Sequence, residues 1–231
     1  KLYDLFAQAP TLGSLIDPNR IAWDAFTMTP AQVMPLLDKA VQLEGDVEIH
    51  ERATAAQGLA KAAELLAGRY TLVATNVPYL GRGKQGTQLQ SFCLQFHPAA
   101  KADLATCFVE RCALLCQPNG TTILVSQQSW LFLTPYKKLR KLLLERYQWN
   151  LLARLGPGAF ETITGEVVNV ALLTLSNVHP TPKDNLVGMD VSVEPTPQRK
   201  AEALTNETPI VLCQAQQLQN PDSTVTLSAS S

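Results

Sequence analysis

Four consecutive residues, Asn76, Val77, Pro78 and Tyr79, carry groups that are suited to chemistry. They follow YTLVAT, an apolar and β-branched run that is typical of a buried strand, and open α/β sheets bind ligands where such strands end. The side-chain oxygen of Asn76 and the backbone carbonyl of Val77 can accept the two hydrogens of an amine, and Tyr79 offers a ring for stacking. Taken alone, N-x-P-Y also fits a turn in which Asn76 caps the strand and Tyr79 packs its ring.

The surrounding elements predict how this motif is positioned. Buried-type runs at Tyr70–Thr75, Thr121–Ser126, Trp149–Leu155 and Val167–Leu175 predict four strands of one sheet, separated by a helical stretch opened by Pro98 and an amphipathic helix over 134–148. The last loop is too short for a crossover helix, so the last strand is expected to be antiparallel and to lie between its predecessors. We therefore expect an α/β fold.

Composition divides the chain into three parts. Residues 1–68 have helical spacing rich in Ala and Leu, residues 69–177 hold the strands, and residues 178–231 turn to Pro, Thr, Asn and Gln and are expected to be a linker or arm. At 46% hydrophobic residues and 17% charged residues the chain is not wholly disordered, collagen-like or a coiled coil. With a net charge of −1, nucleic acid would have to bind a local basic patch.

Several classes of protein lack their usual signals here. No apolar run is long enough to span a bilayer and no leader pattern opens the sequence, so a cytoplasmic protein without a membrane partner is expected. The five cysteines form no CxxC pair, and no metal site is expected. GxSxG, GxxxxGK[ST], HExxH and GxGxxG are absent, which removes the usual signals of serine hydrolases, P-loop NTPases, zincins and simple dinucleotide-binding enzymes.

The run TNVPYLGRGKQ resembles the N-P-P-Y region of adenine-specific DNA methyltransferases, in particular the large methylases of bacteriophage-exclusion (BREX) systems and of fused restriction-modification enzymes. Four more patches are similar in the family's order: LYDLFAQAPTLGSLIDP, GTTILVSQQSWLF, GAFETITGEVVNVALLTL and QLQNPDSTVTL. Together they span most of the chain. The sequence departs from the family at Val77, where proline is usual; the carbonyl remains, but the φ restraint is lost.

The resemblance implies the C-terminal half of a Rossmann-like class I methyltransferase sheet, with a helical N-terminal segment and an irregular C-terminal tail. Residues 69–177 would be a partial catalytic domain, and 178–231 an arm towards a target-recognition region. The implied activity is transfer of a methyl group from S-adenosylmethionine to the N6 amine of an adenine flipped out of double-stranded DNA, in restriction-modification or phage defence.

The resemblance also assigns roles to residues. Asn76 and Val77 would accept the amine hydrogens, Pro78 would hold the preceding carbonyl, and Tyr79 would stack on the base, a contact worth about 1–3 kcal/mol. Phe160 matches the second aromatic of the family and would stack on the base or hold its edge; a loop phenylalanine folded into the core is an equal interpretation. Arg82 and Lys84, in the loop after the motif, would contact phosphates, whereas the basic residues of 137–146 fit a solvated face.

The cofactor half of the family pattern is absent before Asn76. That pattern is a glycine-rich loop after a first strand and an acidic residue ending a second, so this chain alone is expected to be inactive and a longer parent to bind S-adenosylmethionine. The strand ending at Asn76 would be an open edge, covered by the amino-terminal helices, the missing half or a second copy. Two alternatives stay open: a noncatalytic fragment or subunit that supplies the base pocket and DNA contacts, and a generic α/β interaction domain.

Overall fold

The computed structural model describes residues 2–20, 32, 35–36, 38–39, 47–160 and 168–227. The chain divides into two compact units, Lys1–Arg69 and Tyr70–Ser231. Each unit is described by itself. No helix among the described residues is long and apolar enough to cross a membrane.

The described part of the first unit is helical. It contains α1 (Leu2–Phe6), α2 (Ala9–Leu12), the 3₁₀ turns Gly13–Leu15 and Pro18–Arg20, and α4 (Val47–Ala67). On α4, Ala53, Ala60 and Ala63 are buried at a spacing that places them on one helix face. The side-chain amide of Asn19 donates to the carbonyl of Ala67 at 3.0 Å and so satisfies a free carbonyl at the end of α4.

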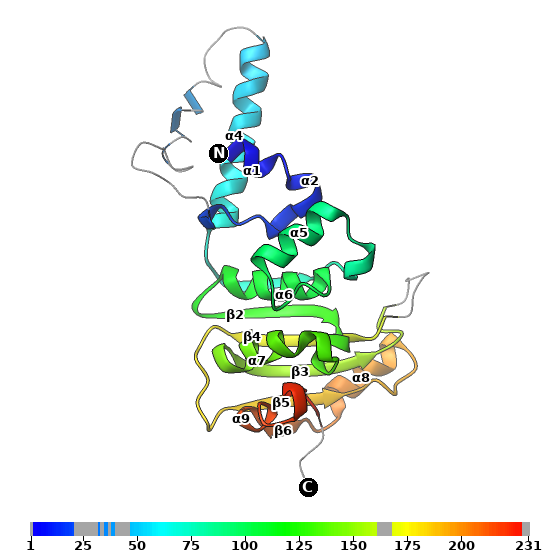
Figure 1. Cartoon of the computed structure of the whole chain (residues 1–231). Helices are drawn as coiled ribbons and strands as arrows, with labels where there is room; N and C mark the ends of the chain where they lie inside the picture. Colours follow the sequence, from blue (N-terminus) through cyan, green and yellow to red (C-terminus); the bar gives the residue numbers. More distant parts are fainter. Residues whose placement is uncertain are drawn as a thin grey trace. The chain divides into compact units, whose positions relative to one another are not determined.

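The second unit is built on a six-stranded sheet (Figure 1). Its strands are β1 (Tyr70–Asn76), β2 (Cys116–Gln127), β3 (Gln148–Gly156), β4 (Val170–Ser176), β5 (Asn185–Asp190) and β6 (Ile210–Cys213), in the order β1-β2-β4-β3-β5-β6. β4 runs antiparallel between β2 and β3, which confirms the prediction for the fourth strand. β1, β2, β3 and β5 are parallel to one another, so they end at the same edge of the sheet.

Helices α6 (Leu104–Leu115) and α7 (Lys137–Arg146) connect the parallel strands and lie across one face of the sheet (Figure 1). In the core, Leu124, Leu173 and Leu152 are neighbours on β2, β4 and β3 and are fully buried. Leu139 and Leu143 of α7, one turn apart, are fully buried as well. The alternating apolar pattern of the strands therefore specifies the face on which the helices pack.

The start predicted at Pro98 for α6 is wrong by six residues. The helix begins at Leu104, and its N-cap is Asp103, whose side chain accepts from the N–H of Ala105 at 2.8 Å. The hydroxyl of Thr106 donates to the carbonyl of Ala100 and holds the preceding residues in a turn. Another helix, α5 (Thr87–Phe96), precedes this turn and had no sequence signal that we recognised.

The segment after residue 177 is not a linker or an irregular tail in its described part, 178–227. β5 pairs with β3, β6 pairs with β5, and α8 (Pro197–Asn206) and α9 (Gln214–Gln217) complete the segment. Val191 and Ala203 join Ala153 and Val170 in one buried cluster. The Thr and Pro content wrongly predicted a linker, because some of these residues are helix-start signals. Thr196 is the N-cap of α8, and Pro197 is its first residue.

β1 is an edge strand. It pairs with β2 on one side, and no strand among the described residues pairs with its other side. Tyr70 is 37% exposed and Leu72 is 57% exposed. β1 therefore ends the strand order of the described sheet, as the sequence predicted, and its covering by another segment stays a prediction.

Candidate functional site

The motif lies where β1 ends, at the edge shared by the parallel strands. Asn76, the last residue of β1, is in register with Val125 of β2. The pairing continues one residue further, because the N–H of Val77 donates to the carbonyl of Val125 at 3.1 Å. The Val77 side chain is buried, and this bond holds the Asn76–Val77 peptide against β2.

Asn76 and Tyr79 contact one another directly. The Tyr79 hydroxyl donates to Oδ1 of Asn76 at 3.3 Å. Burial raises the pKa of the Tyr79 phenol, so the hydroxyl keeps its proton near neutral pH. Because an amide oxygen has two lone pairs, one acceptor position on Asn76 remains for another donor.

A cavity of about 370 Å³ opens beside the motif. It is lined by Tyr79, Leu80, Gly81, Lys84, Asp103, Gln127, Ser129, Val168 and Asn169. These residues come from the loop after β1, the cap of α6, the end of β2 and the start of β4. Its volume falls in the range of small-ligand sites, which are commonly found outside the carboxyl ends of strands.

Backbone hydrogen bonds hold the cavity walls together. The Asp103 carboxylate accepts from the N–H of Leu80 at 3.4 Å, and the N–H of Leu104 donates to the Leu80 carbonyl at 3.0 Å. On the other side, the N–H of Gln128 donates to the Asn169 carbonyl at 2.8 Å and joins the end of β2 to the start of β4. The cavity is therefore bounded by backbone that secondary structure fixes.

Sequence reasoning missed four polar residues of this wall: Asp103, Gln127, Ser129 and Asn169. Asp103 had a usable signal, since an aspartate directly before an apolar helical run is a typical N-cap. The other three had none. They reach the cavity because β2 and β4 are neighbours in the sheet.

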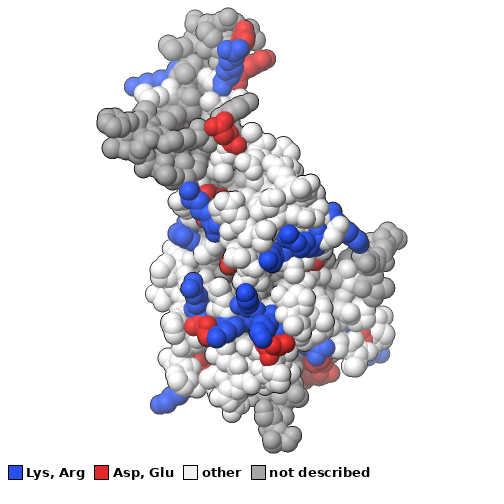
Figure 2. Space-filling model, in the orientation of Figure 1, with Lys and Arg blue, Asp and Glu red and all other residues white. Residues whose placement is uncertain are grey.

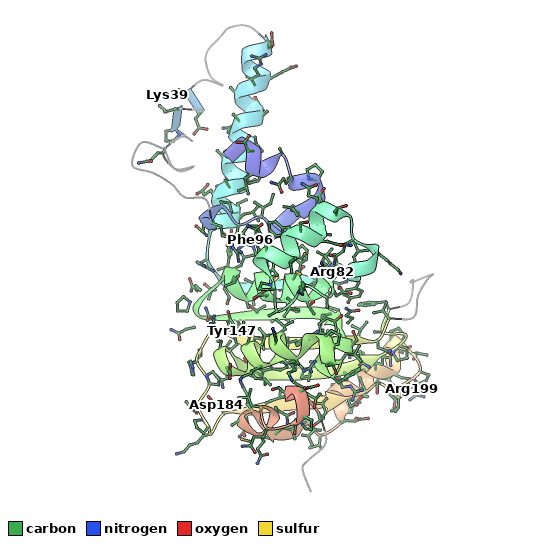
Figure 3. The ribbon with its side chains drawn as sticks, viewed as in Figure 1. Lys39, Arg82, Phe96, Tyr147, Asp184 and Arg199 are labelled. Carbon is green, nitrogen blue, oxygen red and sulfur yellow. The ribbon has the colours of Figure 1, made fainter. Side chains whose placement is uncertain are left out.

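The structure separates the two basic residues of the loop after β1. Lys84 is exposed and lines the cavity. Arg82 is half-buried in the 3₁₀ turn Arg82–Lys84 between β1 and α5 (Figure 3), and its Nη1 is buried with no hydrogen-bond partner among the described residues. A hydrogen bond with Cys107 lowers the pKa of the Cys93 thiol in α5, and the Arg82 charge lowers it further. Arg82 is not part of the cavity lining.

Phe160 lies at the end of the described part of the β3–β4 connection. Its side chain is 39% exposed, so it is not folded into the core, and it does not line the cavity. Residues 161–167, which complete the matching patch, lie outside the described residues. A role of Phe160 at the base stays a prediction.

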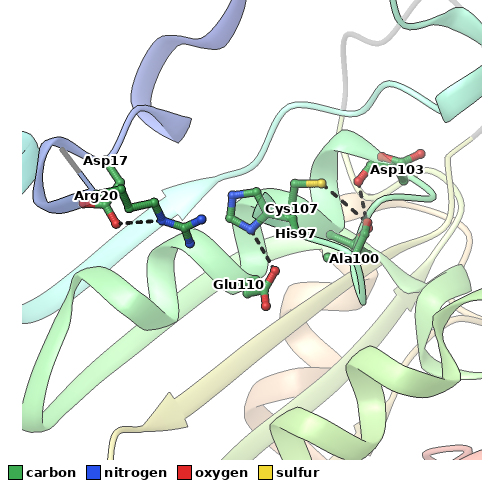
Figure 4. A network of polar contacts seen from close by, with 8 residues as sticks. Asp17, Arg20, His97, Ala100, Asp103, Cys107 and Glu110 are labelled. Carbon is green, nitrogen blue, oxygen red and sulfur yellow. Dashed lines mark hydrogen bonds and ion pairs between the residues drawn. The ribbon is translucent and has the colours of Figure 1, made fainter. Parts of the chain in front are cut away.

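Buried cysteine and histidine side chains of this unit have structural partners. Nδ1 of His97 lies 2.7 Å from the Glu110 carboxylate, and the Cys107 thiol donates to the Ala100 carbonyl at 3.5 Å (Figure 4). Among the described residues, no group of three His, Cys, Asp or Glu side chains is arranged to hold a metal ion.

Residues 32–159, more than half of the chain, match the family described as Eco57I restriction-modification methylase. This chain belongs to that family. The match covers the motif strand, the loop after it, α6, β2 and β3, and it confirms the resemblance seen in the sequence.

Two curated relatives of this Eco57I-family chain carry related names. The adenine-specific methyltransferase BrxX of Escherichia coli O9:H4 (strain HS) is 34% identical over 177 residues, which are 76% of this chain and 14% of BrxX. The adenine-specific methyltransferase PglX of Lacticaseibacillus casei (strain Zhang) is 38% identical over 114 residues, 48% of this chain and 9% of PglX. The chain thus spans a small part of the length of the curated relatives it matches.

The fold also matches a solved structure, the DrdV–DNA complex. The TM-score is 0.52 at 15% sequence identity, over 71% of this chain and 19% of the other. At this identity the likeness shows a shared fold, and it adds nothing about residues.

The described residues of this Eco57I-family chain do not fit the whole of a methyl-donor site. The family resemblance implies S-adenosylmethionine as the donor, held by a glycine-rich loop after a strand. The described residues ahead of β1 are helical and contain no strand, and the outer side of β1 has no described strand beside it. The cavity beside Tyr79 is therefore defined by its own lining residues, without a donor molecule.

Proposed function

We propose that this chain forms the base pocket of an adenine-specific DNA methyltransferase. In this proposal an adenine flipped out of double-stranded DNA enters the cavity beside Tyr79, and its N6 amine receives a methyl group from S-adenosylmethionine bound elsewhere in a longer protein. The observation that carries the proposal is the position of the motif at the end of β1, where Tyr79 lines a cavity of ligand size and its hydroxyl is bonded to Asn76. The names of BrxX and PglX and the family match support adenine as the target.

The chemistry of the acceptor explains the motif. The lone pair of an exocyclic adenine amine is delocalised into the ring, so the nitrogen is a poor nucleophile until both its hydrogens are accepted. The second lone pair of Asn76 Oδ1 and the Val77 carbonyl would accept them. Tyr79, whose ring lines the cavity, would stack on the base.

Among the described residues, the cavity wall carries one basic residue, Lys84, and one acidic residue, Asp103, whose carboxylate accepts backbone hydrogen bonds from Leu80 and Ala105. Lys84 is exposed on the cavity wall, in a position to contact a phosphate beside the flipped nucleotide. With DNA as substrate, we infer a cytoplasmic protein that acts in restriction-modification or phage defence.

A second candidate is a noncatalytic subunit that supplies the base pocket to an assembly. The helical character of the described residues ahead of β1 favours it, because a cofactor cradle is not found there. Binding of S-adenosylmethionine and methylation of DNA by the purified polypeptide distinguish the two candidates. In the first candidate, a single longer polypeptide that contains this chain has both activities. In the second, both activities require another polypeptide.

The proposal predicts that Asn76→Ala, made in the longest protein that contains this chain, lowers the methylation rate by about 100-fold or more. The variant loses an amine acceptor that acts mainly in the transition state, so DNA binding should change little. The rate is measured in single turnovers on a duplex carrying the target adenine. Tyr79→Phe is the matched control: it removes the hydroxyl bonded to Asn76 and keeps the ring, so its effect should be mild. If the Asn76→Ala protein methylated at the unchanged rate, the motif would have no role in catalysis and would be only a structural turn.

A further inference from the structure

Two large apolar side chains are exposed side by side in the chain directly after β2. Phe132 is 42% exposed and Leu133 is 46% exposed. They lie between the 3₁₀ turns Gln128–Leu131 and Thr134–Tyr136.

This pair stands at the rim of the candidate base pocket. The N–H groups of Phe132 and Leu133 both donate to the carbonyl of Ser129, at 3.3 and 3.0 Å. Ser129 itself lines the cavity beside Tyr79. The backbone of the exposed pair is therefore hydrogen-bonded to a residue of the pocket wall.

The backbone under the pair is held unusually firmly. Arg140, a fully buried guanidinium on α7, donates through Nη1 to the carbonyls of Trp130 and Leu133, both at 2.7 Å. Its Nε and Nη2 donate to the carbonyls of Ser223 and Asp222, and burial lowers its pKa. Burying a charge is costly unless it is hydrogen-bonded, and here four backbone carbonyls satisfy the guanidinium and tie the turn to the segment around Ser223.

Buried side chains add to this support. Trp130 is fully buried, and its indole N–H donates to the Ser126 hydroxyl at 3.0 Å. Leu131 is fully buried, and its carbonyl accepts from the N–H of Val225 at 2.9 Å. The turn presents two apolar side chains to solvent on a rigid base.

The charge beside the pair favours a polyanion as the partner. α7 opens with Lys137 and Lys138 and has no acidic residue in its first turn, an arrangement that the helix dipole disfavours. Lys137 is paired with Asp222 at 2.9 Å, and Lys138 is exposed. Figure 2 shows basic side chains gathered over α7.

We propose that Phe132 and Leu133 form an apolar wedge that enters the base stack of double-stranded DNA at the position from which the adenine leaves, with Lys138 beside the backbone. This inference rests on the proposed function and adds the means of extrusion. Base flipping leaves a gap in the stack, and apolar wedges from DNA-binding proteins fill or open such gaps. A rigid wedge loses little conformational freedom when it inserts.

The test uses the longest protein that contains this chain and a duplex with 2-aminopurine, whose fluorescence rises on unstacking, at the target position. The double variant Phe132→Ala/Leu133→Ala should weaken binding and flipping in the paired duplex by at least about tenfold. When the target base is mismatched, flipping costs less, so the deficit should shrink to about twofold or less. Leu94→Ala, which truncates another exposed side chain (47% exposed, on α5), is the matched control and should match the unchanged protein on both duplexes.

Two results would overturn the wedge. The double variant could flip the paired target as well as the unchanged protein does, or it could lose the same factor on paired and mismatched duplexes, which would assign the pair to a contact with another protein region. Failure of the proposed function is seen separately, because then the unchanged protein would neither methylate adenine nor raise the fluorescence of the probe.

Discussion

Val77 extends the pairing of β1 with β2, because its N–H donates to the carbonyl of Val125 at 3.1 Å. The family usually has proline at this position, and proline restricts φ through its ring but has no N–H to donate. The valine therefore keeps the backbone acceptor and makes a strand hydrogen bond that proline could not make.

This bond predicts the effect of Val77→Pro. Proline cannot donate, so the variant should lose about 1 kcal/mol of unfolding free energy in urea titrations, although the carbonyl remains and methylation should persist. Val77→Ile keeps the N–H and serves as the control. If Val77→Pro proved as stable as the unchanged chain, the bond to Val125 would contribute nothing.

The β3–β4 connection begins with two glycines in left-handed backbone, Gly156 and Gly158. Gly156 ends β3 with a φ of +65°, and a Cβ at this position would lie 2.6 Å from Cβ and 2.9 Å from Cα of Ser192. Gly158 has a φ of +64°, yet the nearest atom to its Cβ would be the Pro195 carbonyl oxygen at 3.6 Å. Both glycines have left-handed backbone, but Gly156 alone of the two also meets close packing.

The pair of glycines makes a matched test. Gly156→Ala should lower the unfolding free energy by about 2–4 kcal/mol, from left-handed strain plus overlap with the Ser192 backbone. Gly158→Ala should show the strain alone, about 1–2 kcal/mol. Chemical denaturation of both variants gives the comparison. Equal losses would mean that the approach of Ser192 to β3 is not close in solution.

Sequence patterns predicted the elements whose signal is local. The strand before Asn76 was found from its apolar run, and the antiparallel β4 from the short loop ahead of it. β5 and β6 were missed because they are short and lie among polar residues, and their place in the sheet depends on pairing with β3. Ser129 and Asn169 could not be assigned to the site for the same reason: strand order brings them together, and no spacing in the sequence encodes it.

At the scale of the whole unit, the segment after β4 completes the structure. β5 and β6 extend the sheet beyond β3, and Val191 and Ala203 cover Ala153 and Val170. Leu186 on β5 is fully buried. The second unit therefore depends on residues that composition alone assigns to a linker.

Ending the chain after Asn177 tests this dependence. The shortened chain should aggregate or lose cooperative thermal unfolding, because the outer side of β3 and its apolar cluster become exposed. A chain ending after Leu227 keeps every described element and is the control. Size-exclusion chromatography and circular dichroism report the outcome. If the 1–177 chain proved monomeric and unfolded cooperatively, the second unit would not need residues 178–227 to fold.

The antiparallel course of β4 has a consequence for how such a protein changes over evolutionary time. Because β1, β2, β3 and β5 end at one edge and β4 begins there, the connections after them converge on the same rim. Insertions and substitutions in these loops alter what the rim contacts and leave the strand register intact. The fold thus separates a sheet with a fixed register from a rim whose loops can change.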